Sequence, residues 1–374
     1  MNFNRLIGLL GALGWLMGCS GRYQVGASTD AAGSANSSGT VGSAGSTPGT
    51  AGSAGTDAGS DSVAGGASSV DPGPAESATY CTVALPSTHN QNLASPALVY
   101  SRIFSFLANL PLLPEVGANL PQVTTRTWAG DTALAFLDSL NVPSAAGLNR
   151  FVSTWWPGTP TPELWASYFS SRRGTLANLL TDVVAMPHGS GVLTDPAVLR
   201  LSSISARGTF LFNRLFCQTV PLAPGAIMTV PAMPGLSRRA QLQSAVANPA
   251  CTACHQLIDP LGYAVDDFTV DGSYRPIDNG LPVDTSSVVR LLPSGSSLAF
   301  TDVSDFGRQA ANTCDIVLCF TRQLLADAQL SAGLGVADND GEIAEIAQGF
   351  SRGGLDLRGL VRAIVESDSF LRPE

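Results

Sequence analysis

Two cysteines and a histidine stand together in the segment NPACTACHQLIDPLGY, in a chain of 374 residues that has only three histidines. Cys251 and Cys254 lie three residues apart, so on a helix they would share a face, and His255 follows directly. Covalent attachment of a c-type haem needs two such thiols and an imidazole that binds the iron. The spacing therefore indicates haem attachment through Cys251 and Cys254, with His255 as the ligand of the iron.

Other interpretations of this motif are weighed against its context. A Cys-x-x-Cys pair of the thioredoxin type expects a strand before it and a helix that runs on after it, whereas here Asn-Pro precedes the motif and Asp-Pro follows closely. A zinc site would need a second cysteine pair or another histidine at ligand spacing, and the sequence has neither. A disulfide between Cys251 and Cys254, or a degenerate motif without a cofactor, stays open as an alternative.

Candidates for a second iron ligand all precede the motif, because residues 256–374 contain neither methionine nor histidine. We rank Met233 first, then Met228, then His188. Each also has a simpler structural interpretation, since methionines pack in cores or loops and His188 suits a surface turn. A methionine ligand would raise the reduction potential of the iron, whereas five-coordinate iron would leave room for a small ligand.

General haem chemistry predicts the polar neighbours of the motif. The second imidazole nitrogen of His255 is expected to donate to a backbone carbonyl in a turn at 259–261. Arg275 or Tyr274 is expected to bind a haem propionate, with a surface salt bridge or simple packing as the alternative. The carboxylates of Asp259 and Asp266 stand beside expected turns. We predict that they act as caps and not as acid and base groups.

The first twenty residues have the layout of a secretory signal. One basic residue, Arg5, precedes an apolar run that is shorter than the roughly 20 residues needed to cross a bilayer. The run ends in Leu-Met-Gly-Cys, which resembles the lipobox of bacterial lipoproteins. We therefore expect a signal peptide over residues 1–18, lipidation at Cys19 and, because Ser20 follows, sorting to the outer membrane of the cell envelope. An ordinary cleaved signal is the alternative.

Residues 19–78 are predicted to form a disordered linker. From residue 24 on, they are almost wholly Ala, Gly, Ser, Thr, Asp and Val, and such a segment cannot bury enough apolar surface to offset its ordering entropy. The formal net charge is −9, and no basic stripe is present, which argues against a nucleic-acid partner. The sequence thus favours a folded part whose membrane contact is the lipid anchor at Cys19.

Seven cysteines in an exported chain allow structural disulfides. If Cys19 carries lipid and the motif carries haem, four cysteines remain, which can pair in three ways: Cys81, Cys217, Cys314 and Cys319. Cys314 and Cys319 lie five residues apart on an expected helix and would point to different faces. We expect them to have distant partners or to stay buried and reduced.

The apolar periodicity from Tyr80 onward predicts a mainly α fold with helical domains and long irregular loops. A capping serine followed by proline begins the first expected helix, which ends before Pro111. The expected elements are helices at 95–110, around 131–140, from 161 and after 174, a break at 186–191, helical faces at 303–324 and 357–365, and a possible short strand at 288–292.

The motif and its surroundings resemble an uncharacterised cytochrome-c-like family found in large exported proteins of planctomycetes and myxobacteria, with the pattern CxxCHxxIDPxGxAxExFDxxGxxR. The segments GVLTDPAVL and ARGTFLFNRLFC resemble the stretch before that pattern, and the tail is similar to a helical domain that closes those proteins. The matching residues of the pattern are Cys251, Cys254, His255, Ile258, Asp259, Pro260, Gly262, Ala264, Asp266, Phe268, Gly272 and Arg275.

The resemblance implies three folded segments: a helical domain at 79–187, a cytochrome-c-like domain with the CxxCH motif at 188–295, and a C-terminal helical domain at 296–374. The chain also departs from the family. A histidine usually stands six positions before the first motif cysteine, and Ala245 occupies that position here. The distal side of the haem is therefore left open.

Together these features predict an exported lipoprotein that carries one covalent haem c and passes electrons to or from an unidentified redox protein partner. It is expected to be an electron carrier more than a catalyst. Two alternatives stay open: a cofactor-free surface lipoprotein whose disulfide-stapled helical domain serves interaction, and the haem subunit of an exported oxidoreductase. No hydrolase triad or nucleotide site in the sequence supports another enzyme class.

Overall fold

The structure is a computed structural model, and it describes residues 89–110, 120–140, 145–183, 186–220, 230, 232–290, 292–336 and 339–373. These residues belong to one compact unit. Four features expected from the sequence lie outside the described residues: the signal peptide at 1–18 with the lipidation site Cys19, the linker at 19–78, Cys81 and Met228.

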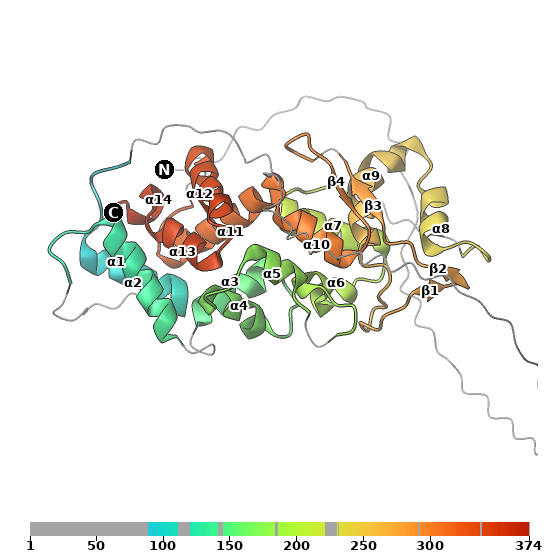
Figure 1. Ribbon diagram of the computed structural model, residues 1–374. Helices are drawn as coiled ribbons and strands as arrows, with labels where there is room; N and C mark the ends of the chain where they lie inside the picture. The colour runs from blue at the N-terminus through green and yellow to red at the C-terminus, as the bar shows by residue number, and fades with distance from the viewer. Residues whose placement is uncertain are drawn as a thin grey trace, which may run out of the picture. The chain divides into compact units, whose positions relative to one another are not determined.

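The described part of the chain is mainly helical, which confirms the predicted fold class (Figure 1). Its helices are α1 (Pro96–Ala108), α2 (Arg126–Ser139), α3 (Ala146–Trp155), α4 (Pro162–Ser170), α5 (Leu176–Thr181), α6 (Pro196–Leu199), α7 (Ile204–Phe216), α8 (Arg238–Ala245), α9 (Pro249–Tyr263), α10 (Val303–Ala311), α11 (Cys314–Ser331), α12 (Asp340–Arg352), α13 (Leu357–Val365) and α14 (Asp368–Leu371), with a 3-10 helix, η2 (Gly191–Thr194).

Two small antiparallel ribbons follow α9. The first pairs β1 (Ile277–Asp278) with β2 (Leu281–Pro282), and the second pairs β3 (Ser287–Val289) with β4 (Leu298–Phe300). Strand β3 overlaps the short strand expected at 288–292, but it begins one residue earlier and ends at Val289. Because β3 also contacts α9, the second ribbon packs against the helix that carries the motif.

Local capping explains where several helices begin and end. Ser95 accepts a hydrogen bond from the amide of Leu98, and Pro96 occupies the first helical position of α1, as the sequence predicts. The single helical face expected from 303 to 324 is instead divided between α10 and α11. The break has a local cause, because the side chains of Asn312 and Thr313 donate to the carbonyls of Arg308 and Gln309 and compete with the helical hydrogen bonds.

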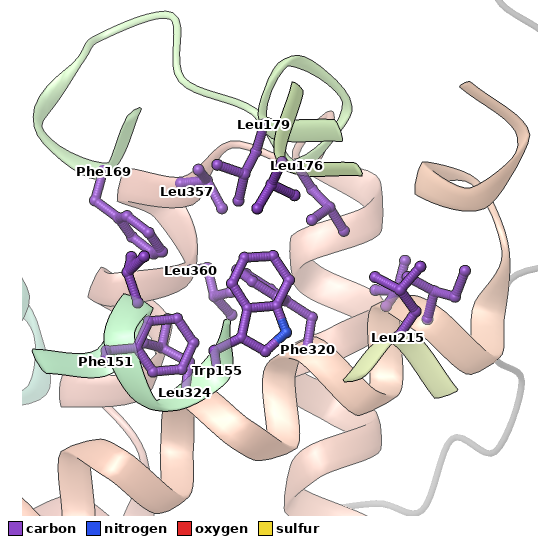
Figure 2. Close-up of a cluster of buried hydrophobic side chains, with 14 of the residues drawn as sticks. Phe151, Trp155, Phe169, Leu176, Leu179, Leu215, Phe320, Leu324, Leu357 and Leu360 are labelled. Carbon is purple, nitrogen blue, oxygen red and sulfur yellow. The ribbon is translucent and has the colours of Figure 1, made fainter. Parts of the chain in front are cut away.

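A large cluster of aromatic and leucine side chains lies between α3, α4, α5, α7, α11 and α13 (Figure 2). Phe320 of α11 is central, since its ring lies 5.9 Å from that of Phe151, 5.0 Å from that of Trp155 and 6.3 Å from that of Phe169. Leucines of α5, α7, α11 and α13 complete the cluster: Leu176, Leu179, Leu215, Leu324, Leu357 and Leu360. One hydrophobic core therefore joins residues from all three folded segments that the resemblance implies.

Two sets of contacts join parts of the chain that are far apart in the sequence. The amide of Ala94 donates to the carbonyl of Leu371 at 2.8 Å, and Arg102 of α1 donates to the carbonyls of Phe370 at 2.9 Å and Arg372 at 2.7 Å. A disulfide connects Cys217, at the end of α7, to Cys319 on α11, 102 residues later. The expectation that Cys319 has a distant partner is confirmed.

Candidate functional site

The motif lies on the first two turns of α9. Asn248 caps this helix by accepting a hydrogen bond from the amide of Ala250, and a proline occupies the first helical position. Cys251 is buried, whereas Cys254 and His255 are half-buried. The expected helical arrangement of the two cysteines and the histidine is therefore present.

The turn expected at 259–261 is absent, because α9 continues through Pro260 to Tyr263. A proline inside a helix cannot donate to the carbonyl four residues earlier, here that of Gln256. Gln256 is exposed, so water can satisfy this carbonyl. Two observations argued against a thioredoxin-type CxxC: Asn-Pro before the motif and Asp-Pro soon after it. Only the first still applies, because the helix does run on after the motif.

Helix α7 packs closely against α9 through glycine. A Cβ atom at Gly208 of α7 would lie 1.9 Å from the carbonyl oxygen of Ile258, and one at Gly262 of α9 would lie 2.0 Å from that of Ile204. No side chain fits between the two backbones at this crossing. The crossing therefore fixes which residues of α7 face the motif.

His255 is held by a carboxylate and a hydroxyl. Its Nδ1 lies 3.0 and 2.9 Å from the two carboxylate oxygens of Asp259, whose side chain is only 5% exposed. Ser205 of α7 donates to Asp259 Oδ1 at 2.6 Å and lies 3.3 Å from His255 Nδ1. Because a carboxylate can only accept, the proton of the neutral imidazole belongs on Nδ1, which leaves the lone pair on Nε2.

This arrangement corrects two expectations. The partner of the second imidazole nitrogen is the side chain of Asp259 and not a backbone carbonyl. Asp259 is also not a cap, because it lies inside α9 and pairs with His255 one turn earlier. Ser205 was not predicted at all, since it stands 50 residues before His255 and no local spacing links the two.

The cysteines of the described chain differ in their bonding. Cys254 has a free thiol, whereas Cys251, Cys314, Cys217 and Cys319 are disulfide-bonded. The alternative in which Cys251 and Cys254 are oxidised to each other is therefore wrong. The donor set fits a c-type haem at His255 and Cys254, and it fits at Cys251 once that disulfide is reduced.

Most of the other candidate residues gather on the segment after α9. His188 stacks on Tyr274 with ring centroids 3.8 Å apart. Arg275 pairs with Asp278 and donates to the backbone carbonyl of Asp266 at 3.1 Å, so its terminal nitrogens are engaged within the chain. The contact of Arg275 with Asp278 is a salt bridge, and binding of a haem propionate by Arg275 or Tyr274 stays a prediction.

Two neighbouring carboxyl groups on this segment are unusual. Asp266 is buried and lies 3.2 Å from Arg238 of α8, so it too is an ion-pair partner instead of the expected cap. Burial raises the pKa of Asp266, and its arginine neighbours oppose that shift. Burial also raises the pKa of Asp267 to about 6, with a further contribution from the charge of Asp266.

Met233, the first-ranked second ligand, is half-buried in the turn before α8. Its amide lies 3.4 Å from the side-chain oxygen of Gln241. Ala245, at the position where the resembling family has a histidine, is the last residue of α8. The assignment of Met233 as a ligand stays a prediction.

A pocket of about 570 Å³ lies beside α8, β3 and β4. Its lining includes two arginines, Arg239 and Arg290, and the acidic Asp305 of α10. The guanidinium of Arg239 lies 4.2 Å from the centre of the ring of Tyr263, the last residue of α9. The pocket is lined by neither the cysteines nor the histidine of the motif.

Comparisons with known proteins match only part of the chain. Residues 188–278, about a quarter of the sequence, match the family PSCyt3, which is described as a protein of unknown function (DUF1588). No curated protein and no solved structure matches the chain. Among the described residues, no helix combines the length and apolar character needed to cross a membrane. The segment that contains the motif is thus similar to a family of unknown function.

Proposed function

We propose that the chain is an exported lipoprotein that binds one haem c covalently through Cys251 and Cys254 and transfers electrons to or from a protein partner. The observation that carries this proposal is the orientation of His255. Its Nδ1 is held by the buried carboxylate of Asp259, so Nε2 is the nitrogen available to bind iron. The name of the matching family, PSCyt3, also points to a cytochrome.

Haem would supply a metal that gains and loses one electron, and the chain would supply its attachment and its proximal ligand. In attachment, each cysteine thiol adds across a vinyl group: a carbon–sulfur bond forms, the thiol proton moves to the neighbouring carbon, and no electron is exchanged. Cys254 is ready for this step as a free thiol. Cys251 needs prior reduction of its disulfide by a thiol reductant, which is oxidised in turn.

The second iron ligand and the lipid anchor are proposed from the sequence. Met233 is the proposed second iron ligand, and Cys19 is the proposed lipid attachment site that anchors the chain to the outer membrane of the cell envelope. Neither the lipid nor the distal ligand is needed for the argument from His255. The lipid would determine where the electron carrier works, and the distal ligand would affect the reduction potential of the iron.

One observation favours a second function. Four of the cysteines in the described chain are disulfide-bonded, Cys251 among them. If this state persists in the cell, the domain is a disulfide-stapled lipoprotein without a cofactor that serves binding to another protein. The two functions therefore differ in the redox state of a single cysteine.

A haem-staining experiment separates the two. The full chain would be expressed with the c-haem maturation machinery, denatured on a gel and stained for haem peroxidase activity, and its mass would be measured. We expect a stained band and a mass increased by one haem. Cys254→Ala should lose at least one thioether bond, whereas Thr252→Ala, an exposed change within the motif, should keep the stain.

A wild-type chain that lacks covalent haem and retains the Cys251 disulfide would overturn the haem proposal. That result would support the cofactor-free interaction domain instead.

A further inference from the structure

We infer that Asp259 and Ser205 are positioning residues that shift the reduction potential of the haem iron in opposite directions, with Asp259 lowering it. This inference rests on the proposed haem attachment. The argument starts from the hydrogen bonds around His255.

The first step is the contact between His255 and Asp259. Both carboxylate oxygens lie within 3.0 Å of Nδ1, and the two residues are one helical turn apart on α9. A carboxylate that accepts the Nδ1 proton increases the electron density on the imidazole and makes Nε2 a stronger donor. A stronger donor stabilises ferric over ferrous iron and lowers the potential.

The second step is the hydroxyl of Ser205, which acts in the opposite direction. It donates to Asp259 Oδ1 at 2.6 Å and so withdraws negative charge from the carboxylate. Removing this hydroxyl should leave more negative charge on the Asp259 carboxylate. Its hydrogen bond with His255 Nδ1 would then be stronger, and the potential of the iron lower. The two residues are therefore expected to shift the potential with opposite signs.

The third step is the helix crossing that brings the two residues together. Ser205 and Gly208 lie three residues apart on α7, and Asp259 and Gly262 lie three apart on α9, so each pair shares a face of its helix. The glycines let the backbones touch, because a Cβ on either would clash with a carbonyl of the other helix. The contact between Ser205 and Asp259 is thus fixed by the crossing and not by side-chain reach alone.

The test compares reduction potentials of haem-loaded full-length variants by spectroelectrochemistry. Asp259→Asn keeps a hydrogen-bond acceptor but removes the charge, and we expect it to favour ferrous iron at least tenfold, which is a rise of about 59 mV for one electron. Asp259→Glu should restore part of the wild-type potential. Asp271→Asn makes the same chemical change on an exposed loop and should shift the potential much less.

Ser205→Ala provides a second test that does not depend on the folding of the Asp259 variants. We expect its potential to fall below that of the wild type. Haem-loaded Asp259→Asn with wild-type helix content and an unchanged potential would overturn the inference, and so would a rise in Ser205→Ala.

A measurement without haem keeps this inference distinguishable from the proposed function. In the metal-free protein, nitrogen-15 NMR of the neutral His255 ring should show the proton on Nδ1 in the wild type and a mixture of tautomers in Asp259→Asn. A wild-type ring with its proton on Nε2 would contradict the positioning role. Absence of haem from the wild type would instead overturn the proposed function and, with it, the effect on the potential.

Discussion

Three buried charged side chains lie on or beside the motif-bearing helix: Arg207, Asp259 and Asp266. Arg207 of α7 is 1% exposed, and its guanidinium donates to four backbone carbonyls: Leu199, Leu201, Val265 and Phe268. Burial lowers the pKa of Arg207 to about 10, which still leaves it charged near neutral pH. This side chain therefore ties the loop before α7 to the segment after α9.

Arg207→Ala should be strongly destabilising. The substitution leaves four carbonyls without their donor and opens a cavity between α7 and the segment after α9, so we expect the free energy of unfolding to fall by about 3 to 5 kcal/mol. Urea denaturation followed by circular dichroism measures this change. Arg200→Ala, at an exposed position nearby, should cost less than about 0.5 kcal/mol, and equal effects of the two variants would contradict the role of Arg207.

Asp267 gives the domain a pH-dependent stability. Its folded-state pKa of about 6 lies above the unfolded value of 3.8, so the folded protein binds this proton more tightly. The contribution of Asp267 is therefore fully present below pH 4 and is lost as the pH rises toward 6 and above. Asp267 Oδ1 also has no hydrogen-bond partner among the described residues, so an amide can replace the carboxyl without breaking a contact there at that atom.

Asp267→Asn should remove this dependence. We expect the variant to gain stability over the wild type by about 1 kcal/mol more at pH 7.5 than at pH 4, a figure reduced for the partial exposure of the side chain. Thermal unfolding of both proteins at the two pH values gives the difference. A gain that is the same at both pH values would show that titration of Asp267 is not its cause.

At this scale, the sequence predicted the residues whose chemistry depends on local spacing. Cys251, Cys254 and His255 occupy one helix as their separation implies. Ser205 could not be predicted, because its contact with Asp259 depends on how two helices cross. Asp259 was assigned to a turn because proline follows it, but α9 continues through Pro260, and the residue whose carbonyl loses its donor, Gln256, is exposed.

The crossing of α7 and α9 is the element-scale feature on which the site depends. It is built from glycines on both helices and from Arg207, which bonds to carbonyls beyond the end of α9. Helix breaks elsewhere, such as that between α10 and α11, come from side chains that compete for helical carbonyls. Apolar periodicity predicted the buried faces of the helices. Helix α13, for example, buries the apolar residues expected between 357 and 365. Periodicity does not show where side chains compete for the helical carbonyls and end a helix.

Two glycine-to-alanine substitutions should have opposite effects. Gly208→Ala places a methyl group against the Ile258 carbonyl, so we expect a loss of about 2 kcal/mol or more and a disturbed contact between Ser205 and Asp259. Gly349→Ala, in α12, meets nothing within 4 Å and should stabilise the protein by about 0.5 to 1 kcal/mol through helix propensity. Guanidinium denaturation of both variants measures the contrast. Similar stabilities would show that α7 moves away from α9 at little cost.

At the scale of the whole molecule, one core and one long-range disulfide unite the described residues. The Cys217–Cys319 bond closes a loop of about a hundred residues that includes the motif helix and both ribbons. The sequence predicted only that Cys319 would have a distant partner, since four cysteines can pair in three ways. The choice of Cys217 depends on how α7 lies beside α11, which no local pattern reports.

The double variant Cys217→Ser/Cys319→Ser tests the contribution of this bond. Closing a loop of that length restricts the unfolded chain, so we expect the free energy of unfolding to fall by about 3 kcal/mol without loss of helix content at 25 °C. Thermal unfolding monitored by circular dichroism gives the change. A melting temperature equal to that of the wild type would mean that the core alone holds α7 against α11.

The contacts of α1 with the last residues of the described chain have a consequence for folding during synthesis. Ala94 and Arg102 have their backbone partners at residues 370–372, about 270 to 280 residues later. A chain that emerges with its N-terminus first can form single helices early, but the hydrogen bonds from Arg102 to the carbonyls of Phe370 and Arg372 cannot form until those residues appear. Part of the core of the nascent chain must therefore stay exposed to chaperones and proteases until residues 370–372 have been synthesised.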